Sequence, residues 1–380
     1  MRLYRTSAGI ALAVLTALAG IAHAEDAAPK PALALPSISD LLTASGLTLT
    51  GYVDGTFAAE KDDTTKQSYD TFALQQAAFT LSMLPKSGFG ALVNVVAGQN
   101  PYSATGFAST PAGIGATSTN FYLLQGFVQY ASGNWLIQGG KFSTLAGAEV
   151  VAPPLNTNTT RSILFAFEPV THTGVRVTYA ASDQLSFIVG VNNGWTNSQD
   201  TSTAGDKTVE AGLAYTPSKT LTWTLQGYYG RDASNYVGAD GSPIRTNIGL
   251  LDTVLTWSAT SALTLVGSVD YGTVKSSPFT PSASWYGLAV YENYAINDLW
   301  RVSLREEYFN DQDGYLTKNF GTNFAGSAQK LKEFTATLGF DPIKSVEIRL
   351  EGRYDDPDKV GGLQFVPKTY QGWLEAYYKF

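Results

Sequence analysis

Hydrophobic and charged side chains alternate along short stretches of this chain, most clearly near its C-terminal end. In the stretch 346–354, Val346, Ile348 and Leu350 fall on one side, and charged residues occupy every intervening position. Successive side chains of a β-strand point to opposite faces, so this two-residue period predicts a strand with one apolar and one charged face. Comparable two-faced stretches occur at 172–179, 263–270, 300–308 and 370–380. The pattern predicts an all-β protein.

The links between the expected strands are alternately short and long. Seven short links carry turn-forming residues, as at 85–88 and 342–344, and eight longer polar links lie between them, the longest at 143–171. These fifteen links join sixteen strands, and both chain ends fall on the side of the short links. Bacterial outer-membrane barrels have this layout, with short periplasmic turns and longer extracellular loops. We therefore expect a transmembrane, up-and-down antiparallel β-barrel of sixteen strands over 46–380, with fourteen strands as the alternative.

The N-terminal segment has the features of a secretory signal peptide. Arg2 and Arg5 precede an apolar run, and a small-x-small cleavage site follows at 22–24. We expect residues 1–24 to be removed and residues 25–45 to form a periplasmic extension before the barrel. No later stretch approaches the roughly 20 apolar residues that a spanning helix needs. These features predict export to the outer membrane of a Gram-negative bacterium.

Charge and composition exclude several classes of function. Without residues 1–24, which hold two Arg and no acid, the chain has 23 basic and 32 acidic residues and a formal charge of −9. Such a chain, in which the basic residues form no cluster, is not expected to bind nucleic acid. It has no cysteine, and His172 is the one histidine left after cleavage. Because no nucleophile elbow or metal motif is present, we expect no enzymatic activity, no cofactor and no metal.

Aromatic residues are abundant, with 21 Tyr, 19 Phe and 7 Trp. Rings with a polar edge favour the two interfaces of a membrane, where they form girdles around a barrel. We therefore expect Trp223, Trp257 and Trp300 at the periplasmic ends of their strands. Trp195 and Trp285 are expected at the opposite rim.

Charged residues on the polar strand faces are candidates to line a water-filled lumen. A barrel of this size leaves an aqueous channel, and an Arg facing lipid at mid-bilayer costs about 2–4 kcal/mol. The longest link, 143–171, contains an apolar run that would be unstable in water, so we expect it to fold into the lumen and narrow it. The alternative is that it covers the outer rim or meets a neighbouring subunit. The candidate pore-lining or constriction residues are Glu149, Arg161, Glu168, His172, Arg176, Arg301, Arg305, Glu307, Glu347, Arg349, Glu351 and Arg353.

Opposed acidic and basic groups at a narrow point determine which ions pass. We therefore expect joint neutralisation of Arg305, Arg349 and Arg353 to shift the channel towards cations. The sequence leaves open whether the segment 143–171 or the segment 25–45 occludes the lumen. It also leaves the identity of the solute open.

Short motifs lie around the longest link and near the start of the expected barrel. They are Gly-Lys-Phe at 140–142, Gly-Ala-Glu at 147–149, Pro-Leu-Asn at 154–156, Arg-Ser at 161–162, His-Thr-Gly-Val-Arg at 172–176, Asn-Gly-Trp at 193–195 and Gly-Tyr-Val-Asp at 51–54. In these motifs the chain resembles the OmpL-like β-barrel porin family, most specifically over about 140–197. The resemblance implies an outer-membrane porin, and it carries over no binding residues.

The chain ends on Phe380, with Tyr378 and Leu374 on the same expected strand face. This ending is similar to the C-terminal assembly signal of outer-membrane barrels, so the barrel-assembly machinery is an expected partner. The other expected partners are outer-membrane lipid, small hydrophilic solutes or ions, and further copies of the chain in a homotrimer. We expect a porin for passive diffusion. The alternatives are a substrate-specific channel and a non-conducting barrel that acts as an adhesin or envelope scaffold.

Overall fold

The computed structural model describes residues 45–63, 66, 68–98, 120–199, 205–237, 243–275, 282–317, 328–359 and 368–380. The expected signal peptide 1–24 and nearly all of the expected extension 25–45 lie outside these residues. Within the described ranges, no helix is both long and apolar enough to cross a membrane.

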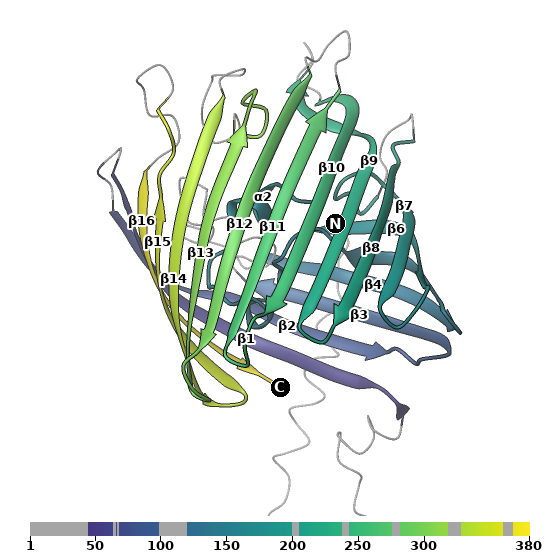
Figure 1. Ribbon diagram of the computed structural model, residues 1–380, viewed down its shortest axis with the longest axis horizontal. Helices are drawn as coiled ribbons and strands as arrows, with labels where there is room; N and C mark the ends of the chain where they lie inside the picture. The colour runs from purple at the N-terminus through teal and green to yellow at the C-terminus, as the bar shows by residue number, and fades with distance from the viewer. Residues whose placement is uncertain are drawn as a thin grey trace, which may run out of the picture. The chain divides into compact units, whose positions relative to one another are not determined.

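In this described part of the chain, sixteen antiparallel strands close into one barrel (Figure 1). Each strand pairs with its neighbours in sequence, and β1 pairs with β16 to close the sheet. The strands are β1 (Thr48–Asp62), β2 (Ser68–Met83), β3 (Gly88–Gly98), β4 (Asn120–Ser132), β5 (Trp135–Ser143), β6 (Thr171–Ala180), β7 (Leu185–Asn192), β8 (Thr208–Ser218), β9 (Leu221–Val237), β10 (Pro243–Ser258), β11 (Leu263–Val274), β12 (Ala283–Ala295), β13 (Trp300–Asp311), β14 (Gln329–Ile343), β15 (Val346–Asp355) and β16 (Thr369–Lys379). The expected up-and-down topology is confirmed, and the alternative of fourteen strands is wrong.

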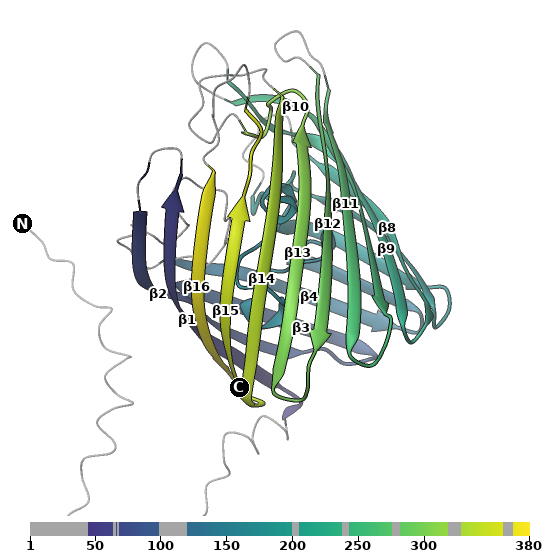
Figure 2. The ribbon, with the colours of Figure 1, turned by 60° about the vertical axis from the view of Figure 1, so that its left-hand side comes forward.

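Short turns join the strands at one end of the barrel, the end at which the C-terminus lies (Figure 2). The turn between β4 and β5 consists of only two residues, Gly133 and Asn134. Gly133 has a φ of 53° and Gly88, at the start of β3, has a φ of 95°. Both values lie in the left-handed region, which glycine adopts without a steric penalty. The strand ends that the longer links join lie at the opposite end, as the spacing of the strands predicts.

The two faces of each strand differ in the way that the sequence period predicts. On β15, Leu350 is 60% exposed on the outer side, whereas Arg349 is 1% exposed and faces inward. Leu350 lies opposite Leu338 of β14 and Leu374 of β16, so apolar side chains continue across neighbouring strands. Directly opposed residues of an antiparallel pair share a face of the sheet. The barrel therefore has an apolar outer face and a polar inner face along these strands.

The barrel closes where the C-terminal residue meets the first strand. Gly51 and Phe380 exchange two backbone hydrogen bonds of 3.0 Å. A Cβ atom at Gly51 would lie 2.5 Å from the Phe380 ring, so a glycine at this position gives the ring its space. Phe380 also packs near Phe79, with ring centroids 5.9 Å apart. The terminal aromatic residue is thus part of the outer apolar face at the closing seam.

Two of the expected girdle residues lie elsewhere. Trp223, Trp257 and Trp300 are on the outer face near the short turns, as expected. Trp285 is 1% exposed and packs in the interior, where its ring stacks on that of Tyr315 at 5.9 Å. Trp195 is partly buried against the same interior cluster. Both tryptophans lie at the expected end of the barrel, near the start of β12 and just after β7, but they pack inward, so the prediction that they join an outer girdle is wrong. The two-residue alternation of β12 directs odd-numbered Trp285 inward.

Candidate functional site

The link between β5 and β6 packs against the inner wall of the barrel. It contains a 3₁₀ helix, η2 (Pro153–Leu155), and a short α-helix, α2 (Ile163–Phe167), which Figure 1 places behind β11 and β12. The hydroxyl of Ser162 caps α2 by accepting the Phe165 N–H at 3.0 Å. Ile163 and Leu164 are fully buried in a cluster with Trp285 and Phe309. Burial of these side chains removes the apolar run from water, which favours this position of the link.

Four arginines of the wall bind main-chain carbonyl groups of the link. On β13, Arg305 donates to Thr160 O and Arg301 to Thr157 O, both at 2.7 Å. On β15, Arg353 donates to the carbonyl of Arg161 at 2.6 Å, and Arg349 donates to the carbonyl of Asn156 at 2.8 Å. Charged donors form stronger hydrogen bonds than neutral donors. The wall therefore holds the link by its backbone through four arginines.

Carboxylates of the wall bind the amide groups of the same segment. Glu351 accepts the N–H groups of Thr159 and Thr160 at 2.6 and 2.9 Å. Glu307 accepts the N–H of Ile163, the first residue of α2, at 2.7 Å. Amides at a helix start have no acceptor within the helix, so this carboxylate satisfies one of them. Donors and acceptors of the link are thus both matched by the wall.

Buried ion pairs complete the network around the four arginines. Arg305 pairs with Glu333 of β14 at 3.0 Å and with Glu149 of the link at 2.9 Å. The other pairs are Arg349 with Glu375 at 3.1 Å, Arg349 with Glu347 at 3.0 Å, Arg353 with Asp355 at 2.8 Å, and Arg301 with Glu347. Removing one partner of such a pair costs about 3–5 kcal/mol, because a charge is left buried and uncompensated.

Arg161 and Glu149 stabilise the link itself. Arg161 donates from Nε to Val150 O at 2.8 Å and from Nη2 to Val151 O at 2.9 Å. Glu149 accepts the N–H of Ser162 at 2.6 Å. Both side chains therefore fold the link into a compact unit, and Glu149 also connects it to Arg305.

His172 and Arg176 form a separate group on β6. Arg176 makes a bidentate pair with Glu210 of β8, at 2.8 and 2.9 Å, and its guanidinium lies 4.2 Å from the centroid of the Phe142 ring. The ring of His172 stacks on that of Tyr228, with centroids 4.8 Å apart. Of the sequence candidates, these two residues and Glu168 lie outside the network around the arginines of β13 and β15.

A third group consists of buried carboxylates. Glu168, the residue that ends α2, lies with Asp252 of β10 and Asp270 of β11, and one oxygen of each is within 4.8 Å of the others. Burial first, and then the charge of Asp252, raises the pKa of Glu168 well above its usual range. Among the described residues, this is the one group of three or more potential ligands that could hold a metal ion.

Sequence analysis missed the partners that complete these groups. Glu333, Glu375, Asp355 and Glu210 lie on polar strand faces, which was the available signal, but the period does not show which arginine each one meets. Asp252 and Asp270 lie on the polar faces of β10 and β11, and nothing in the local sequence connects them with Glu168. Main-chain acceptors such as Thr160 O carry no sequence signal.

A cavity of about 680 Å³ lies beside the link, on the side of β1–β4. Polar side chains of three strands line it, namely Tyr52, Asn94 and Gln125, together with residues 150–152 of the link. Lys379 and Ser345, at the end of the short turns, also line it. Space for water thus remains between the link and this part of the wall.

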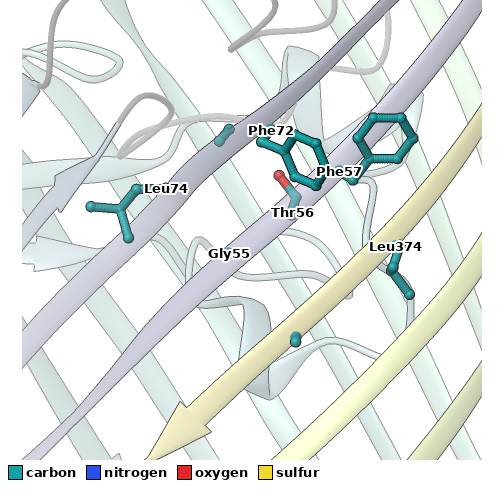
Figure 3. A pocket seen from close by; sticks show the side chains of 8 residues that line it. Gly55, Thr56, Phe57, Phe72, Leu74 and Leu374 are labelled. Carbon is teal, nitrogen blue, oxygen red and sulfur yellow. The ribbon is translucent and has the colours of Figure 1, made fainter.

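A second hollow, of about 370 Å³, is shallow and lies over β1, β2 and β16 (Figure 3). Phe57, Phe72, Leu74 and Leu374 surround it, and Gly55 leaves it open in the middle. The Phe57 and Phe72 rings are 4.8 Å apart between centroids. Because Phe72 is 80% exposed, this hollow belongs to the outer face and is separate from the interior groups.

Residues 46–380 match the protein family described as "Putative beta-barrel porin-2, OmpL-like". The chain belongs to this family. The match covers the whole barrel and confirms the resemblance that the motifs indicate, and the porin is therefore a protein of the bacterial outer membrane. No curated protein matches the sequence.

Solved porin structures share the fold of this porin at low sequence identity. The anion-selective porin of Comamonas acidovorans aligns with a TM-score of 0.63 and 10% identity, over 88% of this chain and 99% of its own. The channel DcaP of Acinetobacter baumannii gives 0.61 and 12%, over 88% and 97%. The trimer form of OmpT of Vibrio cholerae gives 0.61 and 11%, over 88% and 100%.

Proposed function

We propose that this porin conducts small hydrophilic solutes or ions passively, through a lumen narrowed by the link between β5 and β6. The observation that carries the proposal is the set of contacts between Arg305, Arg349 and Arg353 and the link backbone. A segment held in this way lies along the inner wall and reduces the open cross-section. The guanidinium groups of these three arginines are occupied by the link and by carboxylates, and we propose a channel without enzymatic activity.

The route past the link is proposed to run along β1–β4. The cavity of about 680 Å³ on that side supports this route, because its lining includes polar groups such as Asn94 and Gln125. Polar groups replace part of the hydration shell of a passing solute. Of the 12 candidates proposed from the sequence, those on β13 and β15 position the link. The size of the passage that the link leaves open then determines which solutes fit.

We propose a preference for cations. Asp54 and Glu60 point inward from β1, and neither carboxylate has a hydrogen-bond partner among the described residues. Arg305, Arg349 and Arg353 are already paired with other carboxylates. Negative charge along a pore that no basic group pairs with attracts cations and repels anions. The proposed selectivity is opposite to that of the anion-selective porin of Comamonas acidovorans, which has a similar fold.

The remaining expectations complete the proposal. Residues 1–24 are proposed as a signal peptide and 25–45 as a periplasmic extension. The apolar outer face is proposed to contact outer-membrane lipid, and Phe380 to be recognised by the barrel-assembly machinery. A homotrimer is proposed because a trimer form exists for the similarly folded OmpT of Vibrio cholerae. Mass determination of the detergent-solubilised porin tests the trimer.

Single-channel recording in planar bilayers tests the function. The expected result is ohmic conductance, with a reversal potential in a salt gradient that favours the cation. Liposome swelling with sugars of increasing size measures the width of the passage. A protein that is folded but fails to conduct in both assays would overturn the proposal in favour of a non-conducting scaffold. Saturation of the current by one sugar would instead favour a substrate-specific channel.

A further inference from the structure

The carboxylates of Glu168, Asp252 and Asp270 meet at the inner wall of the barrel, one from the link and two from adjacent strands. Asp252 and Asp270 are directly opposed in the pairing of β10 with β11. Glu168 ends α2 and reaches the same point from the link. Gly147, with a φ of 81°, also lies there, and a side chain at this position would collide with the Glu168 carboxylate. The chain thus leaves room for three carboxylates at one place.

Four of the six carboxylate oxygens of this group lack a hydrogen-bond donor among the described residues. They are Glu168 Oε2, both oxygens of Asp252 and Oδ1 of Asp270. All three side chains are more than nine-tenths buried. A buried charged carboxylate without a donor or a positive partner is strongly unfavourable. These oxygens are therefore stabilised by protons that the carboxyl groups retain or by a bound cation.

Other buried acids of the interior are compensated by ion pairs with arginines. Glu333, Glu375 and Glu210 each pair with an arginine at 3.1 Å or less. No ion pair among the described residues includes Glu168, Asp252 or Asp270. These three acids are thus uncompensated in an interior where arginines pair with many of the other buried acids.

We propose that Glu168, Asp252 and Asp270 bind a divalent cation of the size of Ca²⁺. Hard cations of this kind take carboxylate oxygens at about 2.3–2.6 Å, so ligands around one ion lie up to roughly 5 Å apart. The observed limit of 4.8 Å between the three oxygens fits that spacing. Bidentate carboxylates, backbone carbonyls and waters would complete the six to eight ligands that Ca²⁺ takes. The sequence analysis expects no metal, because the three acids lie in separate segments and form no metal motif.

The ion would connect the link to a second part of the wall. Glu168 lies just past α2, whereas the arginine contacts hold the residues before it, such as Asn156 and Thr160. With the ion bound, both ends of α2 are tied to strands. The proposed cation site does not depend on conduction. Calcium binding can therefore be confirmed even if channel recordings reject the proposed function.

Calcium titration of the full-length porin, purified in detergent and stripped with a chelator, tests the site. Isothermal titration is expected to show one Ca²⁺ per chain. The double substitution Asp252→Asn and Asp270→Asn is expected to weaken this binding at least tenfold. Asp356→Asn with Asp358→Asn removes the same charge from exposed rim residues and should leave it unchanged. Equal binding by the wild type and the Asp252/Asp270 variant would overturn the proposal.

A second variant and a second measurement test the site if the Asp252/Asp270 variant does not fold. Glu168→Gln lies outside the strands and keeps the shape of the side chain, so the barrel is expected to form. Thermal unfolding followed by circular dichroism should show a higher midpoint in Ca²⁺ than in chelator for the wild type, and no difference for Glu168→Gln. A Ca²⁺-dependent midpoint that survives Glu168→Gln, or a wild type that does not respond to Ca²⁺, would contradict the assignment.

Discussion

The guanidinium group of Arg353 donates a hydrogen bond of 2.6 Å to the main-chain carbonyl of Arg161, 192 residues away in the sequence. Arg353 is at the same time paired with Asp355 at 2.8 Å. A strand residue thus holds the link by its backbone and remains electrically compensated. This relationship leads to the first of four predictions.

Joint substitution of Arg305, Arg349 and Arg353 by Gln should shift the reversal potential further towards cations. The reason is that their partners Glu333, Glu375 and Asp355 lose their compensation. The conductance should also rise, because three anchors of the link are lost. Single-channel recording in a salt gradient measures both quantities.

Arg231→Gln is the control for this experiment, because Arg231 is 53% exposed and lies near the rim. This substitution should leave the reversal potential at its wild-type value. An unchanged reversal potential in the triple variant would reject the placement of these arginines beside the passage.

Asp54→Asn combined with Glu60→Gln should reduce the preference for cations. Neither carboxylate forms an ion pair with a described basic residue, so the double substitution removes attraction for cations while the ion pairs of Arg305, Arg349 and Arg353 stay in place. The measurement is the permeability ratio of potassium to chloride. Asp183→Asn, in a short turn, provides a control of equal chemistry at a distance from the interior. A ratio that moves equally in both variants would mean that general surface charge determines the selectivity.

Leu164→Ala should destabilise the porin by about 2–5 kcal/mol, because it opens a cavity in a packed cluster. Leu155→Ala is the same substitution within the same link, but Leu155 is 76% exposed, whereas Leu164 is 1% exposed. Leu155→Ala should therefore leave the thermal midpoint nearly unchanged. Circular dichroism in detergent compares the two. Equal midpoints would show that α2 does not contribute to stability through its packing.

In the presence of a chelator, the free energy of unfolding of the porin should fall as the pH rises. The pKa of Glu168 is raised by burial and by Asp252, so the folded chain retains a proton that the unfolded chain has lost. A folded state that binds more protons loses stability with rising pH, beginning near the ordinary glutamate pKa of about 4.3. Thermal midpoints of the wild type between pH 5 and pH 8, in chelator, measure the slope. Glu168→Gln should flatten it, and an equal slope in this variant would assign the effect to other groups.

The barrel could be predicted from the sequence because each strand carries its own evidence. The alternation on β15 shows that the Arg349 side chain faces the interior and the Leu350 side chain faces outward, without reference to any other strand. The partners inside the barrel could not be predicted in this way. Thr160 O meets Arg305, 145 residues further along the chain, only because the barrel folds around the link, and a carbonyl acceptor has no side-chain signature. The orientation of Trp285 could not be predicted because its ring suits both an outer girdle and a packed interior.

The wall arginines bind carbonyl oxygens, which every amino acid supplies. A replacement at Asn156 or Thr160 therefore keeps the acceptor that Arg349 or Arg305 requires. An exposed position such as Leu155, which lines the cavity, can vary in the same way while the attachment persists. In engineering terms, new pore chemistries can be screened at such positions without redesigning the cylinder.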